Sequence, residues 1–181
     1  MATSDLSDSR DLRNALGTFA TGVTVMTASG PDGRPIGMTV NSFSALSLRP
    51  PLVLWGLSRQ NPGAAAFEEA PRFVVNVLSL QQLSLSRQFS RSGTDKFAGV
   101  ALRDGANGVP QLAGCLAWFE CDRVACHEGG DHLIVVGQVT RYEYASGAPL
   151  IFARGRYQRG VDVEVVPDTE GDLAAAWSGL A

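Results

Sequence analysis

Lysine is nearly missing from this sequence, which has a single one, Lys96, among 15 basic residues. With 18 acidic residues the net charge is −3, and no cluster of lysines and arginines is present that would follow a phosphate backbone or an acidic membrane surface. We therefore expect neither nucleic acid nor a membrane among the partners. An anionic small molecule would need a local site.

Cysteine is also scarce. Cys115, Cys121 and Cys126 are odd in number and include no Cys-x-x-Cys pair, which argues against a disulfide framework and favours a reducing compartment. No apolar run approaches the roughly 18 residues of a membrane helix, and the first residues have neither the basic nor the apolar region of a secretion signal. We expect a cytoplasmic protein that is neither exported nor anchored.

Several common motifs are missing. No Gly-x-Gly-x-x-Gly follows an expected strand and no Gly-x-x-x-x-Gly-Lys-Ser/Thr occurs, so the standard phosphate-binding loops are absent. Without a Gly-x-Ser-x-Gly elbow or a cysteine beside an activating group, nucleophilic catalysis has no evident centre. Hydride transfer needs none of these motifs, because a cofactor carries the bond chemistry and the protein stacks, orients and excludes water.

Histidine occurs twice, as His127 and His132, within the segment Cys126–His132, which is expected to be a tight, charged turn. The spacing matches no structural zinc site, so we predict no metal. His132 opens an apolar strand and can reach into a cavity as a hydrogen-bond donor or acceptor. The alternative is a histidine that only caps or satisfies the turn.

The 181 residues include 45% hydrophobic residues and 20 glycines, which indicates one turn-rich domain. We expect a flexible N-terminus over residues 1–9, a domain over 10–160 and a C-terminal tail over 161–181. Residues 91–110 form an unusually long loop, which is more typical of a functional flap or a dimer arm than of a domain boundary.

Hydrophobic patterning predicts mostly strands. A helix capped by Asp8 or Ser9 has its apolar residues on one face up to Phe19 and ends at Gly22. Short helices are expected over Gly63–Ala70, capped by Asn61 with Pro62 at its first position, and over Gln81–Phe89. The expected strands are Val23–Ala28, Pro35–Val40, Leu52–Leu57, Phe73–Leu78, Leu116–Val124, Leu133–Tyr144 and Leu150–Tyr157. The pattern lacks regular βαβ alternation, so the fold class is mainly β with inserted helices, an antiparallel barrel.

Polar side chains follow the second expected strand. Thr39, Asn41, Ser42 and Ser44 supply donors and acceptors directly before the apolar strand Leu52–Leu57. Such an edge suits a flat heteroaromatic ligand, whose face apolar side chains would cover. Trp55, Phe97, Trp118 and Tyr157 are candidate stacking walls, although most single aromatic residues belong to a core. The alternative is a turn that satisfies only its own polar groups.

The segment Ser58–Pro62 is the best candidate for an anion site. It joins a strand end, the permanently charged Arg59 and the start of a helix, and a phosphate would fit there. The alternative is a solvated Arg59 beside an asparagine that merely caps the helix.

Taken in order, these segments resemble the flavin reductase-like family over roughly residues 10–160. The motifs that carry the resemblance are Leu16–Thr27, Thr39–Ser44, Pro50–Leu54, Phe73–Leu78, Asp95–Phe97, Gly130–His132 and Gly155–Tyr157. The resemblance implies an FMN-binding split barrel with Greek-key-like topology, usually a homodimer with the flavin along the dimer interface.

Residue roles follow from the same resemblance. It implies contacts to the isoalloxazine and ribityl groups from Thr39, Val40, Asn41, Ser42 and Ser44. It places the phosphate at Ser58 and Arg59, the flavin's neighbourhood at Lys96 and Phe97, the nicotinamide at His132, and Tyr157 over the pocket. Relatives often have another Ser or Thr after the arginine, whereas this chain has Gln60-Asn61-Pro62, which leaves FMN or FAD open.

The resemblance predicts an NAD(P)H:flavin oxidoreductase that uses NADH or NADPH to reduce FMN or FAD. The reduced flavin would diffuse to a partner monooxygenase. Two alternatives remain open at this point. One is a reductase with tightly bound FMN that acts on another acceptor, and the other is a non-catalytic flavin-binding protein.

Overall fold

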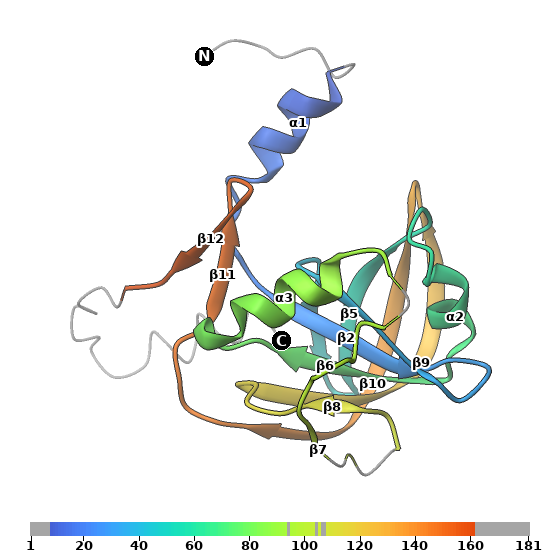
Figure 1. Ribbon diagram of the computed structural model, residues 1–181. Helices are drawn as coiled ribbons and strands as arrows, with labels where there is room; N and C mark the ends of the chain where they lie inside the picture. Colours follow the sequence, from blue (N-terminus) through green and yellow to red (C-terminus); the bar gives the residue numbers. More distant parts are fainter. Residues whose placement is uncertain (1–7, 94, 104, 106–107, 162–181) are drawn as a thin grey trace.

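The computed structural model describes residues 8–93, 95–103, 105 and 108–161 (Figure 1). The predicted flexible N-terminus up to residue 7 and the predicted tail from residue 162 lie outside the described residues. The core and the candidate site fall within the described part of the chain, and four residues of the segment 91–110 lie outside it.

Seven antiparallel strands form the main sheet, in the order β3-β2-β6-β9-β10-β5-β4. Their bounds are β2 Thr24–Ser29, β3 Pro35–Val40, β4 Ser44–Leu48, β5 Pro51–Ser58, β6 Arg72–Val77, β9 Ala117–Gly129 and β10 His132–Tyr144. Side chains of β3 near one edge and β5 near the other pack in one core, so the sheet is curled. The edge strands β3 and β4 are not paired with each other in the described ladder, so the barrel is split. The predicted mainly β antiparallel barrel is confirmed.

Two small sheets accompany the barrel. β1 (Thr21–Gly22), β11 (Leu150–Ala153) and β12 (Arg156–Arg159) form one, and β7 (Leu102–Arg103) pairs with β8 (Gln111–Leu112) in the other. The single strand predicted over Leu150–Tyr157 is therefore wrong. Arg154 and Gly155 have φ angles of 51° and 71° and turn the chain back on itself, because a two-residue turn with positive φ matches the twist of a hairpin.

The described residues form α1 (Ser9–Leu16), α2 (Ala64–Glu69) and α3 (Leu83–Ser90), with a 3₁₀ turn at Leu80–Gln82. Asp8 caps α1 as predicted, because its carboxylate accepts the N–H groups of Arg10 and Asp11. The predicted end at Gly22 is wrong. The helix ends at Leu16 with Gly17 as its C-cap, and Gly22 is held in β1 by pairing with Ile151.

The start of α2 also differs from the prediction. Gly63, not Asn61, is the N-cap residue, and Pro62 precedes the helix. The carboxamide oxygen of Asn61 accepts the N–H of Gly63 at 2.9 Å, and its carbonyl accepts the N–H of Ala64 at 2.9 Å. Asn61 thus closes a turn before the helix, since a short amide side chain readily bonds to backbone two residues on.

The charged turn predicted over Cys126–His132 is much shorter in the structure. β9 continues to Gly129 and β10 begins at His132, so only Gly130 and Asp131 form the turn, with Gly130 at a φ of 73°. Cys126 is paired with Val135, and His127 with Ile134. The charged residues of this segment lie on a long hairpin, because paired strands can carry polar side chains on their exposed faces.

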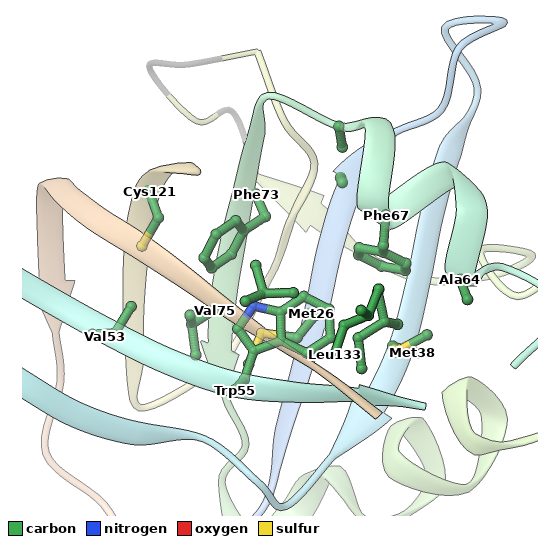
Figure 2. Close-up of a cluster of buried hydrophobic side chains, with 14 residues drawn as sticks. Met26, Met38, Val53, Trp55, Ala64, Phe67, Phe73, Val75, Cys121 and Leu133 are labelled. Carbon is green, nitrogen blue, oxygen red and sulfur yellow. The ribbon is translucent and has the colours of Figure 1, made fainter. Parts of the chain in front are cut away.

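The barrel interior is filled by aromatic and aliphatic side chains (Figure 2). Trp55 is fully buried, with the rings of Phe67 and Phe73 edge-on at 5.6 and 5.9 Å. Trp118 is also buried and belongs to a second cluster beneath α3. Both tryptophans are therefore core residues, and the suggestion that they line a ligand site is wrong.

The described part of 91–110 is bound to the barrel at its end. The hydroxyl of Thr27 donates to the carbonyl of Pro110 at 2.6 Å, and Asn76 accepts the N–H of Leu112 at 2.8 Å. Asn76 and Thr27 are fully buried and bonded to each other at 3.0 Å. A satisfied buried polar pair thus fixes where this segment returns to the sheet.

Candidate functional site

The connection between β3 and β4 lies across the split in the barrel. Thr39 and Val40 end β3, Asn41 and Ser42 lie in the connection, and Ser44 begins β4, a strand that the sequence did not predict. The hydroxyl of Ser42 accepts the N–H of Gly56 at 2.9 Å and bonds to its carbonyl at 3.1 Å. Ser42 therefore fastens the connection to β5. The hydroxyl of Ser44 is exposed and donates to the carbonyl of Ala45.

A hollow of about 180 Å³ brings four predicted ligand residues together, namely Thr39, Val40, Asn41 and Tyr157. The remaining lining residues are Val23, Ser90 and Phe152. Tyr157 reaches the hollow from β12, where its ring packs edge-on against Phe152 at 5.4 Å. In the described part of the chain the Asn41 carboxamide has no hydrogen-bond partner, so its donors and acceptor are available at the rim.

Ser86 holds two sides of this hollow in place. Its carbonyl accepts the hydroxyl of Thr39 at 2.7 Å, and its own hydroxyl lies 2.8 Å from the phenol oxygen of Tyr157. Ser86 is fully buried on α3. Sequence reasoning missed this residue, because Leu-Ser-Leu-Ser in a helix does not indicate which serine faces the sheet.

His132 and Ser58 meet at the end of β5. The two residues are directly opposite in the ladder between β5 and β10. A methyl group built on Gly56 would lie 3.3 Å from the Ser42 hydroxyl and 3.7 Å from Cδ2 of His132, so Ser42 and His132 flank this glycine. Nδ1 of His132 is 2.7 Å from a carboxylate oxygen of Asp131, and this hydrogen bond holds the pKa of Asp131 below its usual value.

Arg59 also belongs to this end of β5. Its N–H donates to the carbonyl of Asp131 at 3.1 Å, and its guanidinium donates to the carboxylate of Glu128 near the tip of the β9–β10 hairpin. The hydrogen bond with Glu128 raises the pKa of Arg59. Sequence reasoning did not identify Glu128, because the two residues are 69 positions apart.

Lys96 and Phe97 line a neighbouring hollow of about 240 Å³ rather than the one at Asn41. The ammonium of Lys96 donates to the carbonyls of Gly37 and Phe89 at 3.2 and 3.1 Å, and burial lowers its pKa. Ser90 lines both hollows, so they adjoin. The other lining residues are Pro35, Ile36, Gly37, Asn61, Pro62, Gly63, Phe67, Arg91, Ser92 and Gly93.

The predicted site residues thus form three adjacent groups along β3 and β5. One surrounds Asn41 and Tyr157, the second lies at Ser42, Ser58 and His132, and the third contains Lys96. Within the described ranges, no three His, Cys, Asp or Glu side chains are grouped to hold a metal ion. No helix in this part of the chain is both long and apolar enough to cross a membrane.

Comparison with known proteins gives consistent results. A family model described as Flavin reductase like domain matches residues 16–160. The FMN reductase (NADH) SmoA of Agrobacterium fabrum is 49% identical over 152 residues, which cover 84% of this chain and 86% of SmoA. HsaB, the reductase subunit of a flavin-dependent monooxygenase of Rhodococcus jostii, is 42% identical over 151 residues, or 83% of this chain and 77% of HsaB.

A solved structure has the same fold. The NADH:FAD oxidoreductase SgcE6 of Streptomyces globisporus, in complex with NAD and FAD fragments, superposes with a TM-score of 0.84 at 35% identity. The superposition covers 94% of this chain and 100% of SgcE6.

Proposed function

The chain belongs to the family of flavin reductase like domains, and we propose that it is an NAD(P)H:flavin oxidoreductase that transfers hydride from a nicotinamide nucleotide to FMN. The observation that carries this proposal is the hollow at the end of β3. There the carboxamide of Asn41, which has no hydrogen-bond partner among the described residues, lies beside apolar walls from Val40 and Phe152. A bound flavin would supply the hydride-accepting chemistry, and the residues of this chain would bind and orient it.

The residues present fit a flavin. An isoalloxazine has a polar edge and a broad apolar face. Thr39, Asn41 and Ser42 are available for the edge. Val40 would contact the face, and Tyr157 would close the pocket. The hydroxyls of Thr39 and Ser42 already bond to backbone, so they support the edge chiefly by fixing its position. Ser44 begins the next strand and would meet the ribityl chain.

The remaining site residues receive the following proposed roles. Ser58 and Arg59 bind the flavin phosphate, since a guanidinium presents a fork of donors that matches phosphate oxygens. Lys96 and Phe97 border the flavin from the adjoining hollow. His132 faces the nicotinamide and holds it against the flavin, because a fixed pair of reactants replaces a bimolecular encounter.

We propose that a second copy of the chain completes the site. A hollow of about 180 Å³ is smaller than the roughly 300–1,000 Å³ of most small-molecule pockets. α1 stands away from the barrel beyond the β11–β12 hairpin (Figure 1) and buries none of its residues. Leu16 and Phe19 are 68% and 77% exposed and line a hollow that shares Asn41 with the flavin pocket. A homodimer would cover this apolar face and the site together.

The names of the relatives support a choice of nicotinamide, of flavin and of partner. SmoA is an FMN reductase (NADH) and HsaB is a reductase subunit of a flavin-dependent monooxygenase. We therefore propose NADH as the hydride donor, FMN as the flavin, and delivery of the reduced flavin to a partner monooxygenase. The described cysteines are all free, which is compatible with work in the cytoplasm.

The test is NADH oxidation by the purified full chain with and without excess FMN. We expect consumption that requires both protein and FMN. A flavin carrier would bind FMN without consuming NADH, and a reductase with resident flavin would need a further acceptor. Asn41→Ala should raise the KM for FMN, whereas Gln81→Ala, an exposed amide away from both hollows, should not change it.

A further inference from the structure

Arg59, the proposed phosphate ligand, already forms an ion pair with an acidic residue. Its Nη2 donates to Oε2 of Glu128, which lies on β9 just before the hairpin turn. The charge of Glu68 on α2 also raises the pKa of Arg59. The guanidinium of Arg59 therefore already has one carboxylate partner, that of Glu128.

The carboxylate of Glu128 and a phosphate monoester require the same donors. A carboxylate is planar and a phosphate is tetrahedral, and each can bind a guanidinium through paired N–H groups. The side chains of Arg59 and Glu128 are 42% and 78% exposed, so a ligand can reach the pair from solvent. A phosphate that binds Arg59 through the N–H groups bonded to Glu128 has to displace that carboxylate.

We propose that Glu128 is a specificity-determining residue that competes with the flavin phosphate for Arg59, so that it weakens FMN binding relative to riboflavin and speeds release of the reduced flavin. This inference rests on the proposed function, because it concerns the phosphate of the same flavin. Competition from Glu128 would explain how a site that contains an arginine, with a helix nearby, can still release FMN as a substrate that leaves.

The expected effect is small and selective. An exposed ion pair contributes little free energy, so removing the competitor should tighten FMN by about two- to five-fold. Riboflavin has no phosphate, and its affinity should stay unchanged. The FMN-to-riboflavin affinity ratio is therefore the quantity to measure, since a general change in the pocket would move both ligands equally.

The experiment is a titration of the full-length protein with FMN and with riboflavin, followed by flavin fluorescence. Glu128→Gln keeps the shape of the side chain and removes its charge. Glu69→Gln is the matched control, because Glu69 is an exposed acid on α2 that makes no ion pair within the described residues. We expect a higher ratio for Glu128→Gln and the native ratio for Glu69→Gln. An unchanged ratio in Glu128→Gln, or an equal rise in both variants, overturns the proposal.

Direct competition is tested by adding Arg59→Ala. In that background the ratio should no longer respond to Glu128→Gln, whereas an equal response in both backgrounds would show long-range repulsion and overturn the proposal. If NADH oxidation requires FMN but the ratio is insensitive to Glu128, only this inference fails. If NADH is not consumed at all, the proposed function fails.

Discussion

Nδ1 of His132 lies 2.7 Å from the carboxylate of Asp131, its neighbour in the turn between β9 and β10. A carboxylate accepts only, so in the neutral imidazole this bond keeps the proton on Nδ1 and leaves Nε2 as an acceptor. The same turn is fixed to β5 through the N–H of Arg59. The β9–β10 turn thereby sets the orientation of the imidazole beside the end of the candidate flavin site.

Replacing His132 should separate nicotinamide binding from flavin binding. For His132→Ala we expect a KM for NADH raised by about tenfold, the scale of one lost hydrogen bond to a ligand, with the dissociation constant of FMN unchanged. Asp131→Ala should give a smaller rise, because the imidazole remains but is no longer oriented. Steady-state kinetics and an FMN titration measure both quantities. Native kinetics in His132→Ala would show that His132 does not help to bind the nicotinamide.

Ser86 and Tyr157 should behave as one unit. Ser86→Ala and Tyr157→Phe each delete the 2.8 Å bond between the two hydroxyls, so each should weaken FMN binding by about 1 kcal/mol. The double variant should lose little more than either single variant, since both remove the same interaction. FMN titrations of the four proteins measure this coupling. Fully additive losses would show that the hydrogen bond does not position Tyr157.

The barrel core should reject a methyl group at Gly137. A Cβ there would lie 2.4 Å from Cζ of Phe73 and 3.0 Å from Cβ of Cys121, next to the irregularity between Val136 and Gly137 in the ladder. We expect Gly137→Ala to lower the free energy of unfolding by about 1–3 kcal/mol, as overpacked cores do.

Gly22→Ala is the control for Gly137→Ala, because no atom of a described residue other than Gly22 and its two chain neighbours lies within 4 Å of the added methyl. Its effect on urea unfolding should stay within about 0.5 kcal/mol. Equal stability of Gly137→Ala and the native protein would contradict the packing described for the barrel.

Two of the cysteines should be unreactive in the folded protein. Burial disfavours the thiolate and raises the pKa of Cys115 and of Cys121 to about 12, so both stay protonated, and hence poor nucleophiles, at neutral and mildly alkaline pH. Cys126 is only partly buried. A thiol reagent should therefore label at most Cys126 before unfolding and all three afterwards. Rapid labelling of all three in the native protein would contradict the fold.

Local chemistry made much of the fold predictable. The strands Val23–Ala28 and Pro35–Val40 were expected and are present as β2 and β3, joined by a turn in which Gly33 has a φ of 75°. β5 and the Asp8 cap were also expected, because an apolar run and a capping carboxylate are visible within a few residues. β4 was missed, since its mostly exposed residues have no buried face to create a pattern.

The candidate site was only partly predictable for a related reason. Residues of the β3–β4 connection are consecutive, so their shared location follows from the chain itself. The partners Ser86 and Glu128 come from elements far away in sequence, and only pairing and packing bring them to Thr39 and Arg59. The residue roles proposed for the site remain predictions to be tested.

The most direct measurement places the protein with NADH and FMN, without oxygen, on one side of a membrane that flavins cross and protein does not. We predict one flavin reduced for each NADH oxidised, only when the protein is present, with reduced flavin appearing in the far compartment. NADH left unoxidised, or reduced flavin retained entirely with the protein, would contradict a reductase that releases its flavin to a partner.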